Sequence, residues 1–423
     1  DLITSQENIQ LAYRNLKKND GSYTAGVDGK NIEYLQKWEM NKLISHTQKK
    51  FNNYSPQPVR RVEIPKPNGK TRPLGIPTIM DRMIQQCILQ VLEPICEAKF
   101  HKKSNGFRPN KSTENAIAQM ETLIQLSNYH IVVDIDIKGF FDNVNHPKLL
   151  KQIWTLGIRD KKLISIISSM LKAEVRGIGI PEKGTPQGGI LSPLLSNIVL
   201  NELDWWIASQ WEFFPLEENK RKNKNYYLKN SKLKRCYIVR YADDFKIICK
   251  KKSDAEKLFI ATKKWLKERL GLETSPEKSK IVNLRKHYSE FLGFKIKVKF
   301  KRKKYVIKSC ISDKAKMKIK ANCNKAIESI QNSKDDLDEI INIQKYNSTI
   351  IGIHNYYQIA TMVCWDFGKI AYEISRTMYI KLRKRVNRKC NKVNKKGYVY
   401  ERYRKEQTST IFIRANSCST WLC

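Results

Sequence analysis

The stretch "CYIVRYADDFKIICK", residues 236–250, holds two adjacent aspartates between two short runs rich in apolar and β-branched residues. Such runs, separated by a polar pair, predict a strand, a tight turn and a second strand. Asp243 and Asp244 then lie at the tip of a hairpin, where their carboxylates repel each other. A carboxylate pair at a turn is often only a solvated turn. A third acid nearby would favour a cation site instead.

The stretch "VVDIDIKGFFDNVNH", residues 132–146, supplies the third acid. It reads as a strand on which Val132, Asp134 and Asp136 face one way. A carboxylate among buried strand residues is costly unless it is paired or bound to metal. Oxygen donors without a His/Cys cluster suit Mg²⁺. Two Mg²⁺ ions about 3.5–4 Å apart can activate a 3′-hydroxyl and stabilise a leaving pyrophosphate.

The charge of the chain indicates a polyanionic partner. The 423 residues include 80 Lys and Arg against 41 Asp and Glu, a net charge of +39. An excess of this size repels itself, and nucleic acid is the partner that best offsets it. A basic membrane-surface protein would concentrate the charge on one amphipathic helix. Here the charge is spread over several segments, so we expect no membrane partner.

The ten cysteines predict reduced thiols rather than a metal or disulfide framework. None forms a C-x2-C pair, which disfavours a zinc ribbon or finger. The chain has no secretory signal and no apolar run long enough to span a bilayer. We therefore expect a cytosolic protein.

Local patterns predict the order of elements along the chain. Helical segments are expected before residue 60, over 78–126 with a loop at 101–113, over 193–206 as an amphipathic helix, over about 253–270, and through most of 313–396. A basic Pro/Gly-punctuated hairpin is expected within 54–77. The segment 219–235 holds eight basic residues and no acid, which predicts an exposed insertion. The lysines of 314–320 are too sparse a pattern to fix their local structure.

Several motifs, taken in order, resemble one known family. "DIKGFFDNVNH", "GTPQGGILSPLLSNIVLNELD", "RYADDF" and "FLGF" are similar to the reverse transcriptase domain of group II intron-encoded proteins, the intron maturases. "RRVEIPKPNGKTRPLGIPTIMDRMIQQ" and "NGFRP" resemble the fingers motifs of that family. The resemblance covers residues 55–295 strongly and the flanking segments weakly.

The resemblance implies an α+β fold of the right-hand polymerase type, with fingers, an antiparallel palm sheet and a mainly helical basic thumb. It divides the chain into fingers and palm (1–295), a thumb or maturase X domain (296–396), and the start of a C-terminal DNA-binding segment or tail (397–423). In "IIGIHNYY" (350–357), Ile351 and Ile353 depart from the family's usual residues. The tyrosines of that segment are expected in the core. No HNH-type constellation follows, so no endonuclease is expected within these residues.

The resemblance also implies a catalytic site. Asp136, Asp243 and Asp244 would be the catalytic metal ligands, joined by the carbonyl of Ile137. Asp134 fits the strand geometry as well as Asp136 does, and we take it as the alternative ligand or as a structural residue. The residues implied to bind nucleotide are Lys66, Arg72, Phe141, Gln187, Gly188 and Lys278. Of these, Phe141 would exclude the ribose 2′-hydroxyl, and Lys278 would lie near the pyrophosphate, where a surface lysine is an equal alternative.

The basic residues that we assign to RNA binding are Arg60, Arg61, Arg108, Lys232, Lys234, Lys314, Lys316, Lys318 and Lys320. The function implied is that of an RNA-directed DNA polymerase of a mobile group II intron, which copies intron RNA into cDNA and also binds that RNA to assist splicing and retrohoming. The expected partners are two Mg²⁺ ions, dNTPs, intron RNA, an RNA template and a DNA primer or target. We expect a ribonucleoprotein in a bacterial cytoplasm.

Two alternatives stay open at this point. One is a bacterial reverse transcriptase outside introns, such as a retron, diversity-generating or defence enzyme. The other is a maturase that only assists splicing. The sequence leaves open the intron subclass, the surface that binds intron RNA, the target DNA site, the oligomeric state, and whether an endonuclease follows Cys423.

Overall fold

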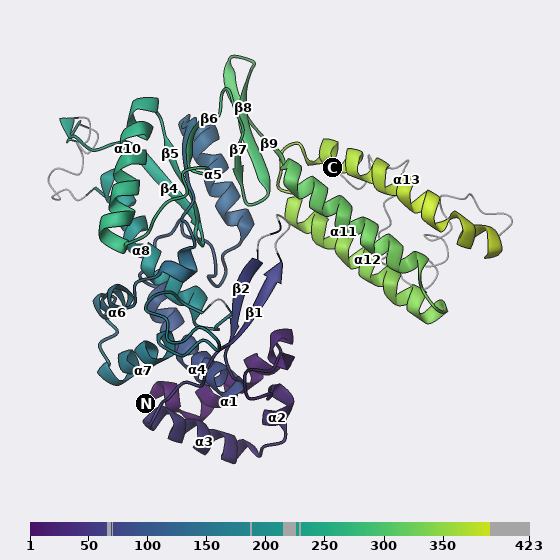
Figure 1. Ribbon diagram of the computed structural model, residues 1–423. Coiled ribbons are helices and arrows are strands. Elements are labelled where there is room, and N and C mark those ends of the chain that lie inside the picture. Colours follow the sequence, from purple (N-terminus) through teal and green to yellow (C-terminus); the bar gives the residue numbers. More distant parts are fainter. Residues whose placement is uncertain (66–68, 70, 187, 215–225, 228–229, 390–423) are drawn as a thin grey trace. The chain divides into compact units, whose positions relative to one another are not determined.

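The computed structural model describes residues 1–65, 69, 71–186, 188–214, 226–227 and 230–389 (Figure 1). The chain divides into two compact units. The first comprises residues 1–120 and 131–281, and the second comprises residues 121–130 and the chain from 282 onward. The second unit therefore includes a segment from the middle of the sequence.

The first unit begins with helices and a hairpin. Its N-terminal elements are α1 (Gln6–Lys17), α2 (Ile32–Gln36), α3 (Met40–Asn52), β1 (Arg60–Pro65), β2 (Thr71–Ile76) and α4 (Ile79–Glu97). Strands β1 and β2 pair antiparallel, as the Pro/Gly-punctuated segment predicts. Helix α5 (Thr113–Ser127) follows a loop and passes from the first unit into the second.

A four-stranded sheet forms the centre of the first unit. Its strand order is β4–β5–β3–β6, with β3 at Ile131–Ile135, β4 at Cys236–Tyr241, β5 at Asp244–Cys249 and β6 at Lys280–Asn283. Strand β5 runs antiparallel to both β3 and β4. The strand and the hairpin predicted from the two acidic stretches are thus confirmed, and they are neighbours in one sheet. This antiparallel sheet agrees with the predicted palm.

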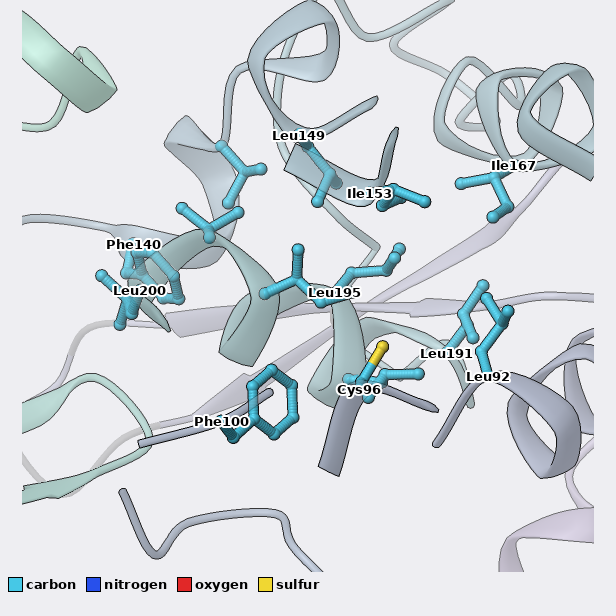
Figure 2. Close-up of a cluster of buried hydrophobic side chains, with 14 of the residues drawn as sticks. Leu92, Cys96, Phe100, Phe140, Leu149, Ile153, Ile167, Leu191, Leu195 and Leu200 are labelled. Atoms are coloured by element: carbon cyan, nitrogen blue, oxygen red, sulfur yellow. The ribbon is translucent and has the colours of Figure 1, made fainter. Parts of the chain in front are cut away.

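Helices cover the sheet and enclose the core. They are the short 3-10 helix η3 (Phe140–Asn143), α6 (His146–Thr155), α7 (Lys161–Leu171), α8 (Ser192–Gln210), and α10 (Lys252–Trp265) continued by the π-turn η5 (Leu266–Leu270). Figure 2 shows Leu195 and Leu200 of α8 among apolar side chains of α4, α6 and α7. The single apolar stripe predicted for 193–206 understates this burial. Even polar Asn197 and Asp204 of α8 are buried, as expected for a helix enclosed on several sides.

In its described part, the second unit combines a small sheet with three helices and the end of α5. Its strands are β7 (Ser289–Phe291), β8 (Phe294–Lys301) and β9 (Lys304–Ile311), with β8 in the middle. Its helices are α11 (Asp313–Gln331), α12 (Asp336–Tyr357) and α13 (Val363–Lys389). The predicted helical region is confirmed as far as residue 389. Of the helices in the described ranges, none combines the length and apolarity needed to cross a bilayer.

The tyrosines of "IIGIHNYY" pack on the "FLGF" turn. The Tyr356 ring stacks on Phe294 with centroids 5.8 Å apart, and its hydroxyl donates to the Leu292 carbonyl at 3.0 Å. The Tyr357 ring lies 5.2 Å from the same phenylalanine. The predicted core position agrees with Tyr357, which is half-buried against the apolar core of the second unit, but it is wrong for Tyr356, which is 37% exposed.

The described cysteines are free thiols. Cys87, Cys96, Cys236 and Cys249 are fully buried. Burial raises the pKa of the Cys87 thiol to about 12, so it is protonated at neutral pH. These placements agree with the expectation of reduced thiols, and burial of this kind makes a thiol unreactive.

Candidate active site

The β4–β5 hairpin turns in two residues. Tyr241 pairs with Asp244, so Ala242 and Asp243 alone form the turn. Ala242 has a φ of 56°, the left-handed conformation that tight hairpin turns require. Asp243 therefore projects from the tip, and Asp244 is the first residue of β5.

The end of β3 lies beside this turn. Ile135 pairs with Phe245 of β5, so the register carried one residue further brings Asp136 next to Asp244. Ile137 is buried and bridges to Thr274. The strand register thus gathers Asp136, Asp243 and Asp244 at one edge of the sheet. It brings together the three acids predicted from separate stretches.

A buried lysine pairs with two of the acids near this edge. Lys246 Nζ lies 3.3 Å from Asp134 Oδ1 and 3.4 Å from Asp244 Oδ1. Burial lowers the Lys246 pKa, but the two carboxylates outweigh it and hold the pKa above its usual value. Desolvation raises the pKa of Asp244, and Lys246 only partly opposes this. Asp134 therefore has the structural pairing that was one of its two predicted roles.

Asp136 forms an ion pair with a second lysine. Lys278 Nζ lies 3.2 Å from Asp136 Oδ2, and both side chains are partly exposed. The Asp136 backbone is fixed as well, because its amide donates to Ser279 Oγ and its carbonyl accepts from the Ser275 amide. Lys278 thus lies beside Asp136, and its role near the pyrophosphate stays a prediction.

The donor set fits a hard divalent ion in its chemistry. It consists of carboxylate oxygens and one backbone carbonyl, the ligands that Mg²⁺ prefers. Among the described residues, however, no three acidic, His or Cys side chains converge closely enough to hold a metal. The physical reason is visible in the ion pairs, since Asp244 and Asp136 are turned toward Lys246 and Lys278. Binding of a metal ion by these acids would require those two contacts to loosen.

A buried arginine holds the catalytic turn. Arg240 of β4 is fully buried and binds both carboxylate oxygens of Asp204 at 2.6–2.9 Å. Its Nη1 also donates to Asn197 Oδ1 at 2.9 Å and to the Ala242 carbonyl at 2.8 Å. The guanidinium therefore links α8 directly to the turn that carries Asp243.

The loop before α5 supports the same turn from another side. The amide of Asn105 donates to the Arg240 carbonyl at 2.8 Å, and the amide of Arg240 donates to Lys103. Gly106 lies so close that an added Cβ would be 2.2 Å from the Ala242 nitrogen. The "NGF" segment therefore requires glycine because of its backbone contact with the catalytic turn.

Two of the predicted nucleotide-binding elements contact each other. The Phe141 carbonyl accepts from the Thr185 amide at 2.7 Å, which attaches the loop 184–189 to η3. Gly188 has a φ of 112°, and an added Cβ would be 2.6 Å from the Gly75 carbonyl of β2. The loop therefore packs against η3 through Thr185 and against the β1–β2 hairpin through Gly188. Lys66 and Gln187 lie outside the described residues, and Arg72 is placed only by its backbone, opposite Ile64.

The arginines assigned to RNA binding differ in solvent exposure. Arg61 is exposed and lines a pocket of about 170 Å³ together with Pro73 and Lys183. Arg60 is half-buried. The Arg108 side chain is only 5% exposed, and its guanidinium binds Glu97 and the carbonyls of His101 and Ser104. The assignment of Arg108 to RNA binding is not supported by this placement, because its donors hold the loop together.

The lysines assigned to RNA binding also divide into two groups. Lys316 pairs with Asp366 at 2.5 Å, and Lys320 pairs with Glu373 at 2.5 Å, both joining α11 to α13. Lys314 and Lys318 lie one turn apart and are exposed. Lys232 is exposed and Lys234 half-buried. The exposed members are the ones available to a partner.

Arg240, which holds the β4–β5 turn, and Lys246, which pairs with Asp244, were not predicted from the sequence. Each is a charged residue within an otherwise apolar strand, and each is buried. A buried charge needs a partner, so a cation in an apolar strand beside the acidic pair would have predicted a buried ion pair.

An aspartate pair at the β4–β5 turn, with a third aspartate just after the neighbouring strand β3, is the arrangement expected of a nucleic-acid polymerase palm. Residues 64–296 match the family model described as reverse transcriptase (RNA-dependent DNA polymerase). The chain belongs to the reverse transcriptase family, and the resemblance to its intron-encoded members is confirmed by the relatives. The family generally uses a divalent metal ion.

Three curated relatives show the extent of the likeness. Protein YkfC of Escherichia coli is 34% identical over 70% of this chain and 81% of its own length. The group II intron-encoded protein LtrA of Lactococcus lactis is 33% identical over 82% of this chain and 64% of its own. The putative COX1/OXI3 intron 2 protein of Saccharomyces cerevisiae is 30% identical over 70% of this chain and 38% of its own. The chain thus spans less than two thirds of each of these two intron proteins.

Among solved structures, a telomerase from Candida albicans in complex with a fragment of telomeric RNA covers 83% of this chain and 63% of that one. Its TM-score is 0.41 at 15% identity, too slight a likeness to bear on the function.

Proposed function

We propose that this chain is the RNA-directed DNA polymerase of a mobile group II intron, which copies intron RNA into cDNA and binds that RNA to assist splicing and retrohoming. The observation that carries the proposal is the strand register that brings Asp136 beside the Asp243–Asp244 turn. The likeness to LtrA and to the yeast intron protein favours the intron setting over other bacterial reverse transcriptases.

Asp136, Asp243, Asp244 and the Ile137 carbonyl would hold two Mg²⁺ ions. When bound, these ions would lower the pKa of the primer 3′-hydroxyl and stabilise the leaving pyrophosphate. Asp243 projects from the turn, so it is the more direct ligand of the pair. Arg240 fixes the turn through the Ala242 carbonyl, and Lys246 holds Asp244 until the ion replaces it.

The remaining roles concern the incoming nucleotide. The 3′-oxygen attacks the α-phosphorus of a dNTP, the bond to pyrophosphate breaks, and the hydroxyl proton is released. Lys278, next to Asp136, is placed to meet the negative charge that develops on the pyrophosphate. Phe141 and Gly188 belong to elements in contact, as expected for one pocket that excludes the 2′-hydroxyl and receives the base pair. Lys66, Arg72 and Gln187 complete the proposed set.

We assign fingers and palm to residues 1–295, a thumb or X domain to 296–396, and a tail to 397–423. The proposed partners are intron RNA, an RNA template, a DNA primer or target, and dNTPs, within a bacterial cytoplasmic ribonucleoprotein.

Primer extension on an RNA template tests the polymerase. Wild-type protein with Mg²⁺ should extend a DNA primer with dNTPs and not with rNTPs. Asp243→Ala should abolish extension, and removal of the metal by EDTA should do the same. Asp254→Ala, an acid at the start of α10 outside the site, is the matched control and should leave extension unchanged. Undiminished primer extension by the Asp243→Ala variant would contradict the proposal.

A second function, RNA binding that assists splicing, has its own supporting observation in the net charge of +39. Asp243→Ala should spare splicing assistance while it abolishes polymerisation. Neutralising Lys314 and Lys318 should weaken intron binding and flatten its salt dependence. Intact splicing at near-physiological salt after neutralising these lysines and those of 219–235 would argue against these surfaces.

A further inference from the structure

The β8–β9 hairpin of the second unit carries lysines on one face. Lys295, Lys297, Lys299 and Lys301 alternate along β8 with the apolar residues of the opposite face. The register places Lys308 opposite Lys297 and Lys304 opposite Lys301. Like charges directly opposite on a sheet destabilise it. Protection of a sheet edge does not explain the lysines of β8, because β8 is the central strand.

Besides its opposed lysines, the hairpin has turn residues that are unfavourable for their backbone conformation. Its two turn residues, Arg302 and Lys303, have φ of 48° and 63°, a conformation that Asn and Gly adopt more readily. Residues 299–304 are all exposed, and five of these six are cations. Within the described part of the chain, Lys295 alone among the hairpin's cations forms an ion pair, with Asp313 at 2.7 Å. Local rules broken together at one element indicate a functional surface.

An aromatic pair lies at the same tip. Phe300 is 66% exposed, and its ring centroid lies 5.2 Å from that of Tyr305 on the opposing strand. The Arg285 guanidinium covers Tyr305 at 4.2 Å from the ring centroid. An exposed aromatic among cations is the combination on which an unpaired base stacks while its phosphates are neutralised.

The hairpin is held in place rather than free-standing. The side chain of Gln125 donates to the Tyr305 carbonyl at 3.2 Å and accepts from the Ile307 amide at 2.8 Å. These bonds satisfy the outer edge of β9. Figure 1 shows the β8–β9 turn at the end of the sheet away from α11. The tip is therefore a preorganised surface, which reduces the entropy lost on binding.

We propose that the tip of the β8–β9 hairpin, residues 299–304, is an RNA-binding element that grips phosphates with its cations and stacks an unpaired base on Phe300. The choice of RNA as the polyanion rests on the proposed function. The tip belongs to the second unit, whereas Asp136, Asp243 and Asp244 belong to the first, and we expect polymerisation on a short template to proceed without the tip.

The test compares a tip variant with a matched control. Lys299→Thr, Lys301→Thr, Arg302→Asn and Lys303→Gly together remove four charges, and Asn-Gly preserves the turn. The control removes four exposed lysines of the first unit, namely Lys250, Lys251, Lys257 and Lys267. Binding of a stem–loop RNA is followed by fluorescence anisotropy between about 50 and 200 mM salt.

The tip variant should bind the stem–loop at least tenfold more weakly than the control at low salt. Its slope of log affinity against log salt should be shallower by up to about three, from four cations at roughly 0.7 each. Phe300→Ser should weaken binding of the stem–loop but not of a blunt duplex. A tip variant that matches the control in affinity and slope overturns the proposal. So does a loss seen equally with single-stranded DNA of the same sequence, or seen only with anionic lipid vesicles.

Two further measurements separate the possible causes of failure. Lys304→Thr removes the opposed pair that Lys304 forms with Lys301 at the tip, so it should raise the melting temperature by roughly one to a few degrees while it weakens RNA binding. A misfolded variant cannot give that combination, and unchanged RNA binding by Lys304→Thr counts against the proposal. Primer extension on a short unstructured template should persist in the tip variant. Failure of extension in the wild type would overturn the proposed polymerase, yet the anisotropy result would still decide the hairpin.

Discussion

Arg240 and Lys246 are buried cations on neighbouring strands, on either side of the catalytic turn. Arg240 has a carboxylate, an amide oxygen and a backbone carbonyl as partners, so its charge is paired and each of its three guanidinium nitrogens donates a hydrogen bond. Lys246 has two carboxylates. Each cation therefore positions an acid or a turn of the site without lying at its surface.

Arg240→Lys should lower both stability and polymerase activity. Lysine keeps the charge but cannot reach Asp204, Asn197 and Ala242 at once. Because at least one buried acceptor loses its donor, we expect a loss of about 1–3 kcal/mol in the free energy of unfolding. Urea unfolding and primer extension measure the two effects. Lys264→Ala, which removes an exposed pair with Glu268, is the control and should change stability by less than about 1 kcal/mol. Equal effects of the two variants would contradict the role of Arg240.

Lys246→Met should destabilise the fold and shift the pH dependence of activity. The variant leaves Asp134 buried without its cation, at a cost of about 3–5 kcal/mol, and the double variant Lys246→Met/Asp134→Leu should recover most of that loss. Lys246 lowers the pKa of Asp244, so its removal raises that pKa further. Metal binding needs the ionised carboxylate, and activity should therefore fall at a higher pH on the acid side. An unmoved acid limb in the pH–rate profile would count against this coupling.

At the scale of elements, the catalytic turn is fixed by three segments that are distant in the sequence: β3, α8 and the loop before α5. The alternation of side chains along the sequence correctly predicted β3 and the β4–β5 hairpin, because this pattern depends only on neighbouring residues. The contact of Arg240 with Asp204, 36 residues away, depends on how α8 lies against β4, and no local pattern encodes that. The burial of Arg108 was missed for the same reason, since its partners come from the tertiary folding of its own loop.

Gly106→Ala should displace the catalytic turn. The new Cβ would be 2.2 Å from the Ala242 nitrogen, and a backbone atom cannot move aside as a flexible side chain can. We expect primer extension to fall by about tenfold or more, as misplacement of catalytic groups by roughly 1 Å costs up to 10²-fold. Gly352→Ala in α12 is the control, because its Cβ meets nothing within 4 Å and alanine favours a helix. Wild-type activity in Gly106→Ala would show that the turn tolerates a shift.

At the scale of the whole molecule, the net charge of +39 works against folding. Added salt screens this repulsion, so the melting temperature should rise with ionic strength, and heparin should raise it at low salt. Differential scanning fluorimetry measures both. The matched comparison is the tip variant of the β8–β9 hairpin, whose melting temperature should depend less on salt. A melting temperature that is flat or falls with salt in the wild type would contradict the importance of self-repulsion.

The second unit takes residues 121–130 from the middle of the chain, and Gln125 in that segment binds the edge of β9. During synthesis this segment leaves the ribosome about 150 residues before its partners exist. At roughly 5–20 residues per second, about 8 to 30 seconds pass before its partners are synthesised. During this interval the end of α5 is exposed to chaperones and can form non-native contacts. The second unit therefore completes its folding only after the strands that contact α5 have been synthesised.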